Sequence, residues 1–135
     1  MNYQSACNII RTRFKTEIAD IYSLSTQYDN DGLFNKPDDG TEYSRFNIRT
    51  VSAEQVETGS THRYRRFGLV VVQLFFPFGI GDKDLKITED HIISAFEGSN
   101  DSDVHFKTAY LEEVGRDGSY WQENVNLPFY FDDVK

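Results

Sequence analysis

The stretch RYRRFGLVVVQLFFPFGIGD, from Arg63 to Asp82, decides how this chain folds. It begins with a cluster of arginines and continues into a run from Leu69 to Phe76, in which seven of the eight residues are apolar. Because a strand points successive side chains to opposite faces, this run predicts a strand that is apolar on both faces. Each of the two faces then needs a layer that covers it.

Two amphipathic helices are predicted to supply one of these layers. Residues at intervals of three and four form an apolar stripe over residues 2–23 and again over 85–97, and Gly98 follows the second stripe as a helix stop. The stripes consist of Ala6, Ile10, Phe14, Ile18 and Ile21 in the first helix, and of Leu85, Thr88, Ile92 and Phe96 in the second.

Three further strands are predicted from alternating patterns. Residues 43–57 alternate Phe46 and Ile48 with polar side chains. Residues 104–114 and 119–131 flank the turn sequence Gly-Arg-Asp-Gly, which is typical of a hairpin. In the last strand, Trp121, Val125, Leu127, Phe129 and Phe131 share one face, and Gln122, Asn124 and Asn126 share the other.

These elements predict an α+β fold, with an antiparallel four-stranded sheet and two helices packed on one face in α-β-β-α-β-β order. We expect a single domain over residues 1–135, with a long loop at about 24–42. The second face of the central strand has two explanations that stay open. Either the long loop covers it with Tyr28, Leu33 and Phe34, or another subunit does.

The charge of the chain is divided unevenly along its length. Up to Gly81, nine acidic residues balance nine basic ones, whereas from Asp82 onward thirteen acidic residues face five basic ones, which gives the net charge of −8. This balance disfavours general nucleic-acid binding, which needs a basic surface. It permits head-to-tail contact between copies, in which a basic patch meets an acidic one.

The remaining composition indicates a soluble protein made in the cytosol. The single cysteine, Cys7, cannot form an internal disulfide, and we see no secretory signal. The longest apolar run, from Leu69 to Ile80, is too short to span a bilayer.

Two motifs resemble ligand-binding loops, but both depart from the required pattern. FGIGDKD follows a strand and precedes a helix, yet Asp84 occupies the place of the third glycine of a dinucleotide loop, and its carboxylates would repel a pyrophosphate. QYDNDGLFNKPD has the Asp-x-Asp-Gly core of a calcium loop, but Gln27 and Asp38 stand at its first and last ligand positions. Ordinary turn chemistry is the favoured interpretation of both.

No arrangement of titratable residues indicates catalysis. The three histidines, His62, His91 and His105, lie in different predicted elements, and Glu112 and Glu113 are adjacent on a strand and so point to opposite faces. We therefore predict no enzymatic activity, no cofactor and no metal ion.

The sequence HRYRR remains as a candidate interface. Strand geometry places Arg63 and Arg65 on one side, and Arg66 with Tyr64 on the other. These arginines form either a solvated strand end or an ion-pair patch between subunits, with occasional contact to DNA phosphates.

Motifs along most of the chain, in the right order, resemble those of one family. They form a loop element, a central strand with a Pro-x-Gly-x-Gly exit, the end of the second helix, and the final hairpin. The residues are Tyr28, Asn30 and Phe34; Arg66, Gly68, Leu69, Val72, Gln73, Phe75, Pro77, Gly79 and Gly81; Ser94 to Gly98; and Gly115, Arg116, Asp117, Gly118, Trp121, Gln122, Asn124, Val125, Pro128, Phe129, Phe131 and Asp132. This pattern resembles the tail terminator (tail completion, minor tail) proteins of long-tailed bacteriophages.

The resemblance implies a structural virion protein at the head-proximal end of the tail, assembled in the host cytoplasm. Such proteins form a homo-oligomeric ring, commonly of six copies, which caps the polymerised tail tube and stops its elongation. The ring offers a docking surface to the head-tail connector, and DNA passes through its lumen without specific binding. The candidate residues for the subunit or tube interface are Arg63, Arg65, Arg66, Tyr28 and Phe34.

Two alternatives stay open. One is a head-completion or neck protein at the same joint. The other is an acidic inhibitor that mimics DNA and binds a host nucleic-acid enzyme; the arginines at 63, 65 and 66 interrupt the carboxylate surface that such a mimic needs.

Overall fold

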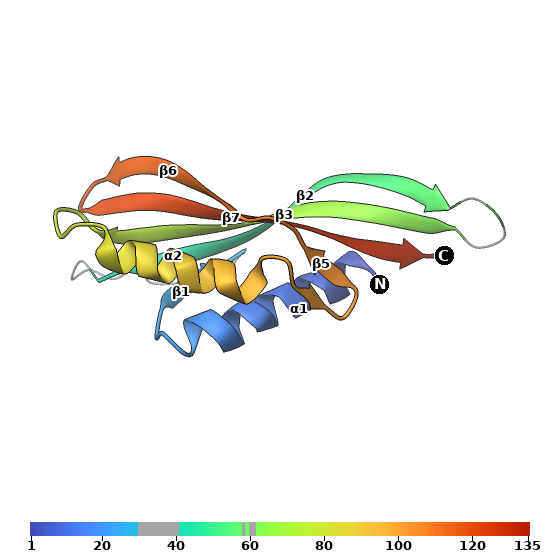
Figure 1. Cartoon of the computed structure of the whole chain (residues 1–135), viewed down its shortest axis with the longest axis horizontal. Coiled ribbons are helices and arrows are strands. Elements are labelled where there is room, and N and C mark those ends of the chain that lie inside the picture. Colours follow the sequence, from blue (N-terminus) through green and yellow to red (C-terminus); the bar gives the residue numbers. More distant parts are fainter. Residues whose placement is uncertain (30–40, 58, 60–61) are drawn as a thin grey trace.

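The strand predicted from the opening stretch forms the centre of the sheet. The computed structural model describes residues 1–29, 41–57, 59 and 62–135. In it β3 (Arg63–Pro77) runs along the molecule between two antiparallel neighbours, β2 (Tyr43–Glu57) and β7 (Tyr120–Val134) (Figure 1). All three strands are 15 residues long, so they extend well beyond the part of the sheet that the helices cover.

Short strands extend the sheet on both sides. Beside β2 lies β1 (Ser25–Tyr28), which runs parallel to it. The outer edge of β7 pairs with β6 (Tyr110–Asp117) near one end and with β5 (Val104–Phe106) further along, and β5 in turn pairs with β4 (Asn100–Asp101). The result is a seven-stranded mixed sheet.

Both helices lie on the same face of this sheet, as predicted (Figure 1). The first, α1 (Tyr3–Phe14), begins at Asn2, whose side chain accepts a hydrogen bond from the Ser5 N–H, and continues into one π-helical turn, η1 (Lys15–Ala19). The second is α2 (Lys83–Phe96). The core between helices and sheet contains Ile10, Phe14, Ile18, Leu85, Ile92 and Phe96 from the helices, and Phe46, Val70, Val72, Leu74, Val125, Leu127, Phe129 and Phe131 from the strands.

The prediction of four antiparallel strands was wrong, and so was the simple order of elements. The strand β1 lies inside the predicted long loop. The sequence did not predict it, because its four residues are mostly polar and carry no alternating signal. The predicted strand over 104–114 is divided into β5 and β6 opposite Pro128, whose carbonyl accepts from the Lys107 N–H. Because proline has no N–H, Pro128 cannot donate the second hydrogen bond of this pair, and the ladder of hydrogen bonds is interrupted there.

Two details of the helix stripes also differ from the prediction. Ile21 is 64% exposed because regular helix ends at Ala19. On α2 the buried polar position is Glu89 rather than Thr88, since Glu89 points at a second buried carboxylate on β7.

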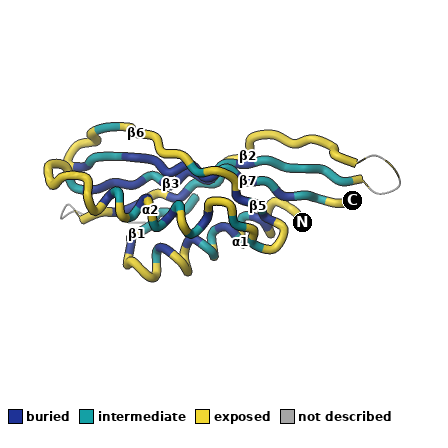
Figure 2. The backbone as a smooth tube through the Cα atoms, in the orientation of Figure 1, coloured by how far each residue is buried: buried dark blue, intermediate teal, exposed yellow. Residues whose placement is uncertain are grey.

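The second face of β3 is covered by neither helix. The residues of β3 on this face include Leu69, Val71 and Phe75, and the adjacent residues of β7 are polar amides. Phe75 stacks on Tyr43 at 4.6 Å between ring centroids, and Tyr120 packs edge-on against Tyr43, so these rings cover one another. Further along this face Val71, Asn124 and Asn126 are also buried, whereas Phe67 and Leu69 are partly exposed. Its flanking strands β6 and β2 are largely exposed (Figure 2).

Candidate partner interface

The three predicted arginines meet a pair of aspartates at the end of β7. We call the group of Glu57, Arg63, Arg65, Arg66, Asp132 and Asp133 the arginine end. The antiparallel register sets Arg65 directly opposite Asp132, and as predicted Arg66 projects to the other face.

Each arginine of this group has an acidic partner within the chain. Both Arg65 Nε and Nη2 donate to Asp132, at 2.9 and 3.1 Å, and Arg63 Nη1 donates to the same carboxylate at 3.2 Å. Arg66 Nε lies 3.4 Å from Asp133 Oδ2. The hydrogen bond from Arg65 lowers the pKa of Asp132 below its usual value, although partial burial opposes this effect. The arginine end is therefore an internally neutralised network.

Tyr28 lies apart from the arginine end. Its ring packs against Phe14 and Phe46, at 6.4 and 5.7 Å between centroids, on the face that the helices cover. Across the sheet, Tyr28 of β1 is opposite Phe46 of β2, and Phe46 is opposite Val72 of β3. Val72 is six residues along β3 from Arg66 of the arginine end. At about 3.3 Å per residue this separation is roughly 20 Å. Tyr28 therefore does not cover the open face of β3, while Phe34 and Leu33 lie outside the described residues.

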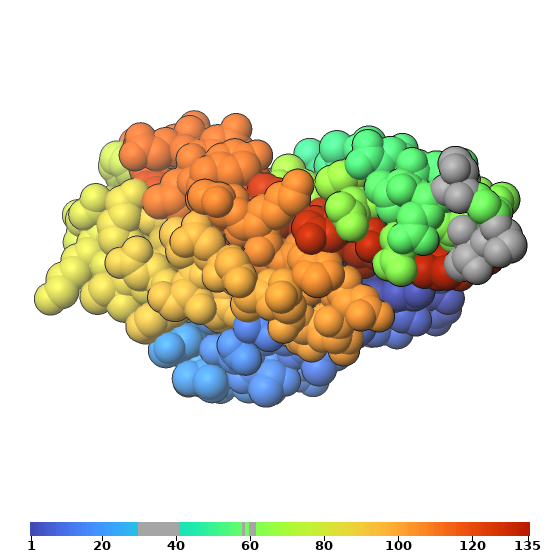
Figure 3. Space-filling model, turned by 45° about the vertical axis from the view of Figure 1, so that its right-hand side comes forward, coloured from blue at the N-terminus to red at the C-terminus, as the bar shows by residue number. Residues whose placement is uncertain are grey.

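The open face of the sheet is hollowed. Two adjoining hollows of about 470 and 370 Å³ share Leu69 and Tyr110 in their lining, and we call them together the concave groove. Figure 3 shows the notch between β6, in orange, and β2, in green. The lining residues are Arg49, Val51, Ser52, Phe67, Gly68, Leu69, Val71, Lys107, Tyr110, Leu111, Glu112, Asn124, Asn126, Pro128 and Phe129.

The concave groove has a mixed lining of apolar side chains, amides and charged groups. Lys107 Nζ lies over the rings of Phe67 and Tyr130, at 4.9 and 5.4 Å from their centroids. Neither Lys107 nor Arg49 forms an ion pair with any residue that the structure describes. The carboxylate in the lining, Glu112, accepts a hydrogen bond from Asn124 Nδ2 at 3.1 Å. The groove thus offers apolar surface and unpaired positive charge together.

A buried pair of carboxylates lies on the helix side of β7. Glu123 Oε1 accepts from Lys86 Nζ at 2.7 Å, and its Oε2 accepts from Trp121 Nε1 at 2.9 Å. Burial alone would raise the pKa of Glu123, but these hydrogen bonds lower it. Glu89 is 1% exposed and neither of its oxygens has a hydrogen-bond partner, although Lys86 Nζ approaches to 3.3 Å. Burial, followed by the nearby Glu123, raises the pKa of Glu89 to about 7.

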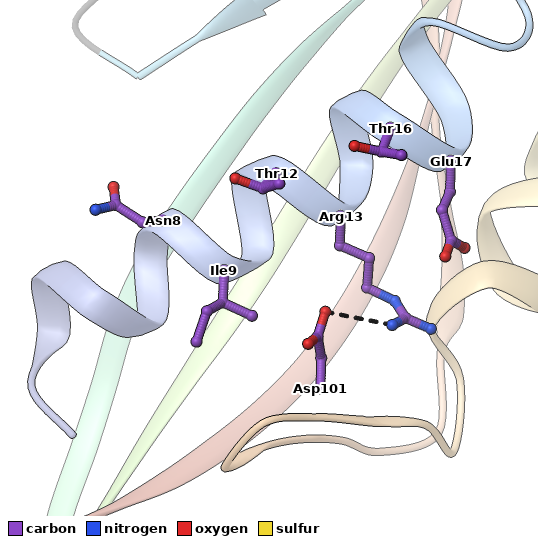
Figure 4. A pocket seen from close by; sticks show the side chains of 7 residues that line it. All are labelled: Asn8, Ile9, Thr12, Arg13, Thr16, Glu17 and Asp101. Carbon is purple, nitrogen blue, oxygen red and sulfur yellow. Dashed lines mark hydrogen bonds and ion pairs between the residues drawn. The ribbon is translucent and has the colours of Figure 1, made fainter.

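A further hollow, of about 390 Å³, lies along α1 (Figure 4). Its polar groups are already used for packing. Arg13 donates from Nε and Nη2 to the Ala95 carbonyl, at 2.9 and 2.6 Å, and forms an ion pair with Asp101 at 3.4 Å. Arg13 thereby satisfies a carbonyl in the last turn of α2, which would otherwise lack a partner. This hollow is a structural joint between elements.

The motifs that resemble ligand loops have structural roles where they are described. FGIGDKD forms the turn from β3 into α2, with Gly79 and Gly81 at φ of 93° and 84°. Most of the calcium-like sequence lies outside the described residues, but Asp29 Oδ2 accepts from the Ile48 N–H at 2.8 Å and so caps the edge of β2. Over the described ranges, no three of the His, Cys, Asp and Glu side chains are grouped to hold a metal ion. None of the described helices is both long and apolar enough for a membrane span.

Comparisons with known proteins give the fold and not a family. No protein-family model and no curated protein matches the sequence. Among solved structures, one of a protein without a descriptive name superposes with a TM-score of 0.65 at 13% identity, and the match covers 92% of this chain and 94% of the other. The mixed α+β architecture with two helices and a curled sheet is therefore shared by another protein over nearly its whole length.

Sequence reasoning missed the cations of the concave groove. The alternation of Arg45, Asn47 and Arg49 along β2 was visible, and it does place both arginines on the open face. No sequence pattern placed Lys107 on this face, because its position depends on the break between β5 and β6 opposite Pro128.

Proposed function

We propose that this protein is a ring-forming tail terminator of a long-tailed bacteriophage. In this role, copies of the chain would form a ring of about six on the last ring of the tail tube, stop its elongation, and present a surface to the head-tail connector. The observation that carries the proposal is the concave groove, a hollow opposite the helices whose lining includes the exposed or half-buried side chains of Val51, Phe67, Leu69, Tyr110 and Leu111. Exposed apolar side chains gathered in one hollow favour a contact with another protein.

The motifs behind the resemblance have consistent positions in the fold. Gly68 lies where an added Cβ would be 2.3 Å from the Phe129 ring, so the packing of that ring over β3 needs a glycine there. Gly115 and Gly118 adopt φ of 115° and 59° around the β6–β7 turn. These residues support a fold shared with the tail terminator proteins. The proposed terminator function is further supported by the occurrence of all these motifs together along one chain.

The charge distribution favours a protein partner over DNA. The arginines that would contact phosphates, Arg63, Arg65 and Arg66, are neutralised by Asp132, Asp133 and Glu57. With a net charge of −8, such a ring would let DNA pass by like-charge repulsion.

The decisive experiment removes the protein from its phage. We expect tails of the deletion strain to be longer than normal and variable in length in negative-stain images, and a plasmid copy of the chain to restore the normal length. Tails of normal length that still lack heads would favour the head-completion alternative. Sealed, infectious tails of normal length would contradict the proposal.

A second measurement addresses the ring itself. Light scattering across protein concentration, with images of any large species, should reveal closed rings with a central hole. The DNA-mimic alternative predicts a different result, namely dose-dependent inhibition of a nucleic-acid enzyme by the isolated protein.

A further inference from the structure

The turn at the exit of β3 exposes apolar side chains among carboxylates. Phe78 and Ile80 are 46% and 62% exposed, although they follow a strand that is otherwise buried. The turn stands at one extremity of the molecule, on the left in Figure 1. We call this turn, with Glu42, Asp82, Asp84 and Glu113 around it, the acidic tip.

Two hollows flank the acidic tip, of about 350 Å³ on the Phe78 side and 230 Å³ on the Ile80 side. Their described lining contains the carboxylates of Glu42, Asp82, Asp84, Glu113 and Glu123, while the Arg116 guanidinium lies over the Phe78 ring at 4.1 Å from its centroid. Apart from Glu123, these carboxylates have no ion pair with any residue of the described ranges. A partner for this surface must therefore bring an apolar hollow with positive charge at its rim.

The concave groove of the same chain has this chemistry. Its apolar lining includes Val51, Phe67 and Leu69, and its charges without an ion pair are those of Lys107, Arg49 and Glu112, so cations outnumber the carboxylate. The arginine end does not offer an equivalent surface, because its cations are already bound to Asp132, Asp133 and Glu57.

We propose that the acidic tip of one copy inserts into the concave groove of the next copy. Phe78 and Ile80 then contact the apolar lining, and the carboxylates around them face Lys107 and Arg49. Tip and groove are different surfaces of one chain, so the contact is heterologous and generates a ring where the rotation closes. This inference rests on the proposed function only for its place in the ring, and the contact can be tested without a tail.

The test uses charge reversal on each side of the contact. Glu113→Lys and Lys107→Glu should each weaken self-association of the full chain by roughly tenfold or more, measured by sedimentation velocity, because like charges then face each other. An equimolar mixture of the two variants should restore association, since each tip then finds a groove of opposite charge. Asp103→Lys, an exposed position in the β4–β5 turn, is the matched control and should leave association unchanged.

A cross-link locates the contact independently. In a Cys7→Ser background, chains with Ile80→Cys and chains with Val51→Cys should form disulfide-linked pairs when mixed and oxidised, and much less when either is oxidised alone. Raising the salt concentration should reduce the yield, because the charges involved are exposed.

Three outcomes would overturn the inference. These are a wild-type chain that stays monomeric at all concentrations, rings that persist unchanged in both charge-reversal variants, and a groove that binds a DNA duplex through Lys107 without self-association. None of them removes the terminator proposal, which tail length in the deletion strain decides. Conversely, normal tails together with restored association in the mixture would keep the contact and reject the terminator.

Discussion

The two ends of β3 are opposites in how they use their charges. At its start, Arg63, Arg65 and Arg66 stand out in the sequence, yet each is bound to an acidic partner in the same chain. At its exit, the sequence after Pro77 indicates only an ordinary turn from a strand to a helix. This turn nevertheless exposes Phe78 and Ile80 among unpaired carboxylates. A conspicuous cluster of charges is therefore a poor guide to a surface that is open to a partner, because pairing within the chain can satisfy it.

This difference separates residues that hold the fold from residues that are open to contact. The arginine end ties the long β2–β3 hairpin to the last residues of β7, beside the start of α1, where Arg66 lies over the Tyr3 ring at 5.4 Å. At the acidic tip Arg116 lies over the Phe78 ring at 4.1 Å, but Glu42, Asp82, Asp84 and Glu113 form no ion pair with any described residue. Substitutions at the two ends should therefore have different consequences for stability and for association.

The largest effect is expected from Gly68→Val, on the strand that joins the two ends. A Cβ there would lie 2.3 Å from the Phe129 ring and 2.9 Å from the Arg49 carbonyl oxygen, so the ring would have to leave its place in the core and the β2 backbone would have to shift. We expect the free energy of unfolding to fall by about 3 kcal/mol in chemical denaturation. As a control, Gly59→Ala meets no atom within 4 Å, so only backbone strain at its φ of 147° opposes it and the loss should be smaller. A neutral Gly68→Val would show that the strands are not packed this closely.

The next effect concerns the arginine end. Asp132→Asn removes the charge that binds Arg63 and Arg65 together, and we expect a loss of about 2 kcal/mol. Because the pKa of Asp132 is lowered in the folded chain, its contribution is present above its unfolded pKa and is lost as the pH falls through the folded value. Unfolding curves of wild type and Asp132→Asn should therefore converge at acid pH. Unchanged stability at neutral pH would mean that the arginines are solvated rather than bound.

The parts of this fold that sequence could predict are those decided by local patterns. The two-faced strand, the opposite faces of Trp121 and Gln122, and the Gly-Arg-Asp-Gly turn all follow from side-chain alternation or turn chemistry within a few residues. The stop near Gly98, whose φ is 70°, has the same local origin.

The parts that sequence could not predict depend on a partner far along the chain. Arg65 and Asp132 are 67 positions apart, so the pattern HRYRR alone left a subunit contact and a solvated strand end equally open. Likewise, the division of β5 from β6 depends on Pro128 in a different strand. Glu89 interrupts an apolar stripe because Glu123 and Lys86 are beside it, which no helical periodicity reveals.

Glu89 provides a pH-dependent test on the acidic side of the molecule. Its folded pKa is about 7, above the ordinary 4.5, so the folded chain favours the protonated form. The stability that this adds is complete below the unfolded pKa and is lost as the pH rises through about 7. Glu89→Gln cannot ionise, so at pH 8 it should be more stable than wild type by about 1–2 kcal/mol.

The control for this prediction is Glu17→Gln, an exposed residue of η1 that should leave the pH profile of wild type intact. If Glu89→Gln kept the wild-type decline in stability between pH 5 and 8, Glu89 would not be the group responsible.

The smallest effect on stability is expected at the acidic tip. Ile80→Ser changes a side chain that is 62% exposed and packs against little of the core, so the free energy of unfolding should change by less than about 0.5 kcal/mol. Leu74→Ala, which truncates a fully buried side chain of the preceding strand β3, is the comparison and should cost about 2–5 kcal/mol. A loss of more than about 1.5 kcal/mol for Ile80→Ser would place Ile80 in the fold rather than at its surface. If Ile80→Ser leaves the free energy of unfolding almost unchanged but weakens self-association, Ile80 is a contact residue, unlike the structural residues of the arginine end. A substitution weakens association without destabilising the fold only where the side chain contacts another copy of the chain.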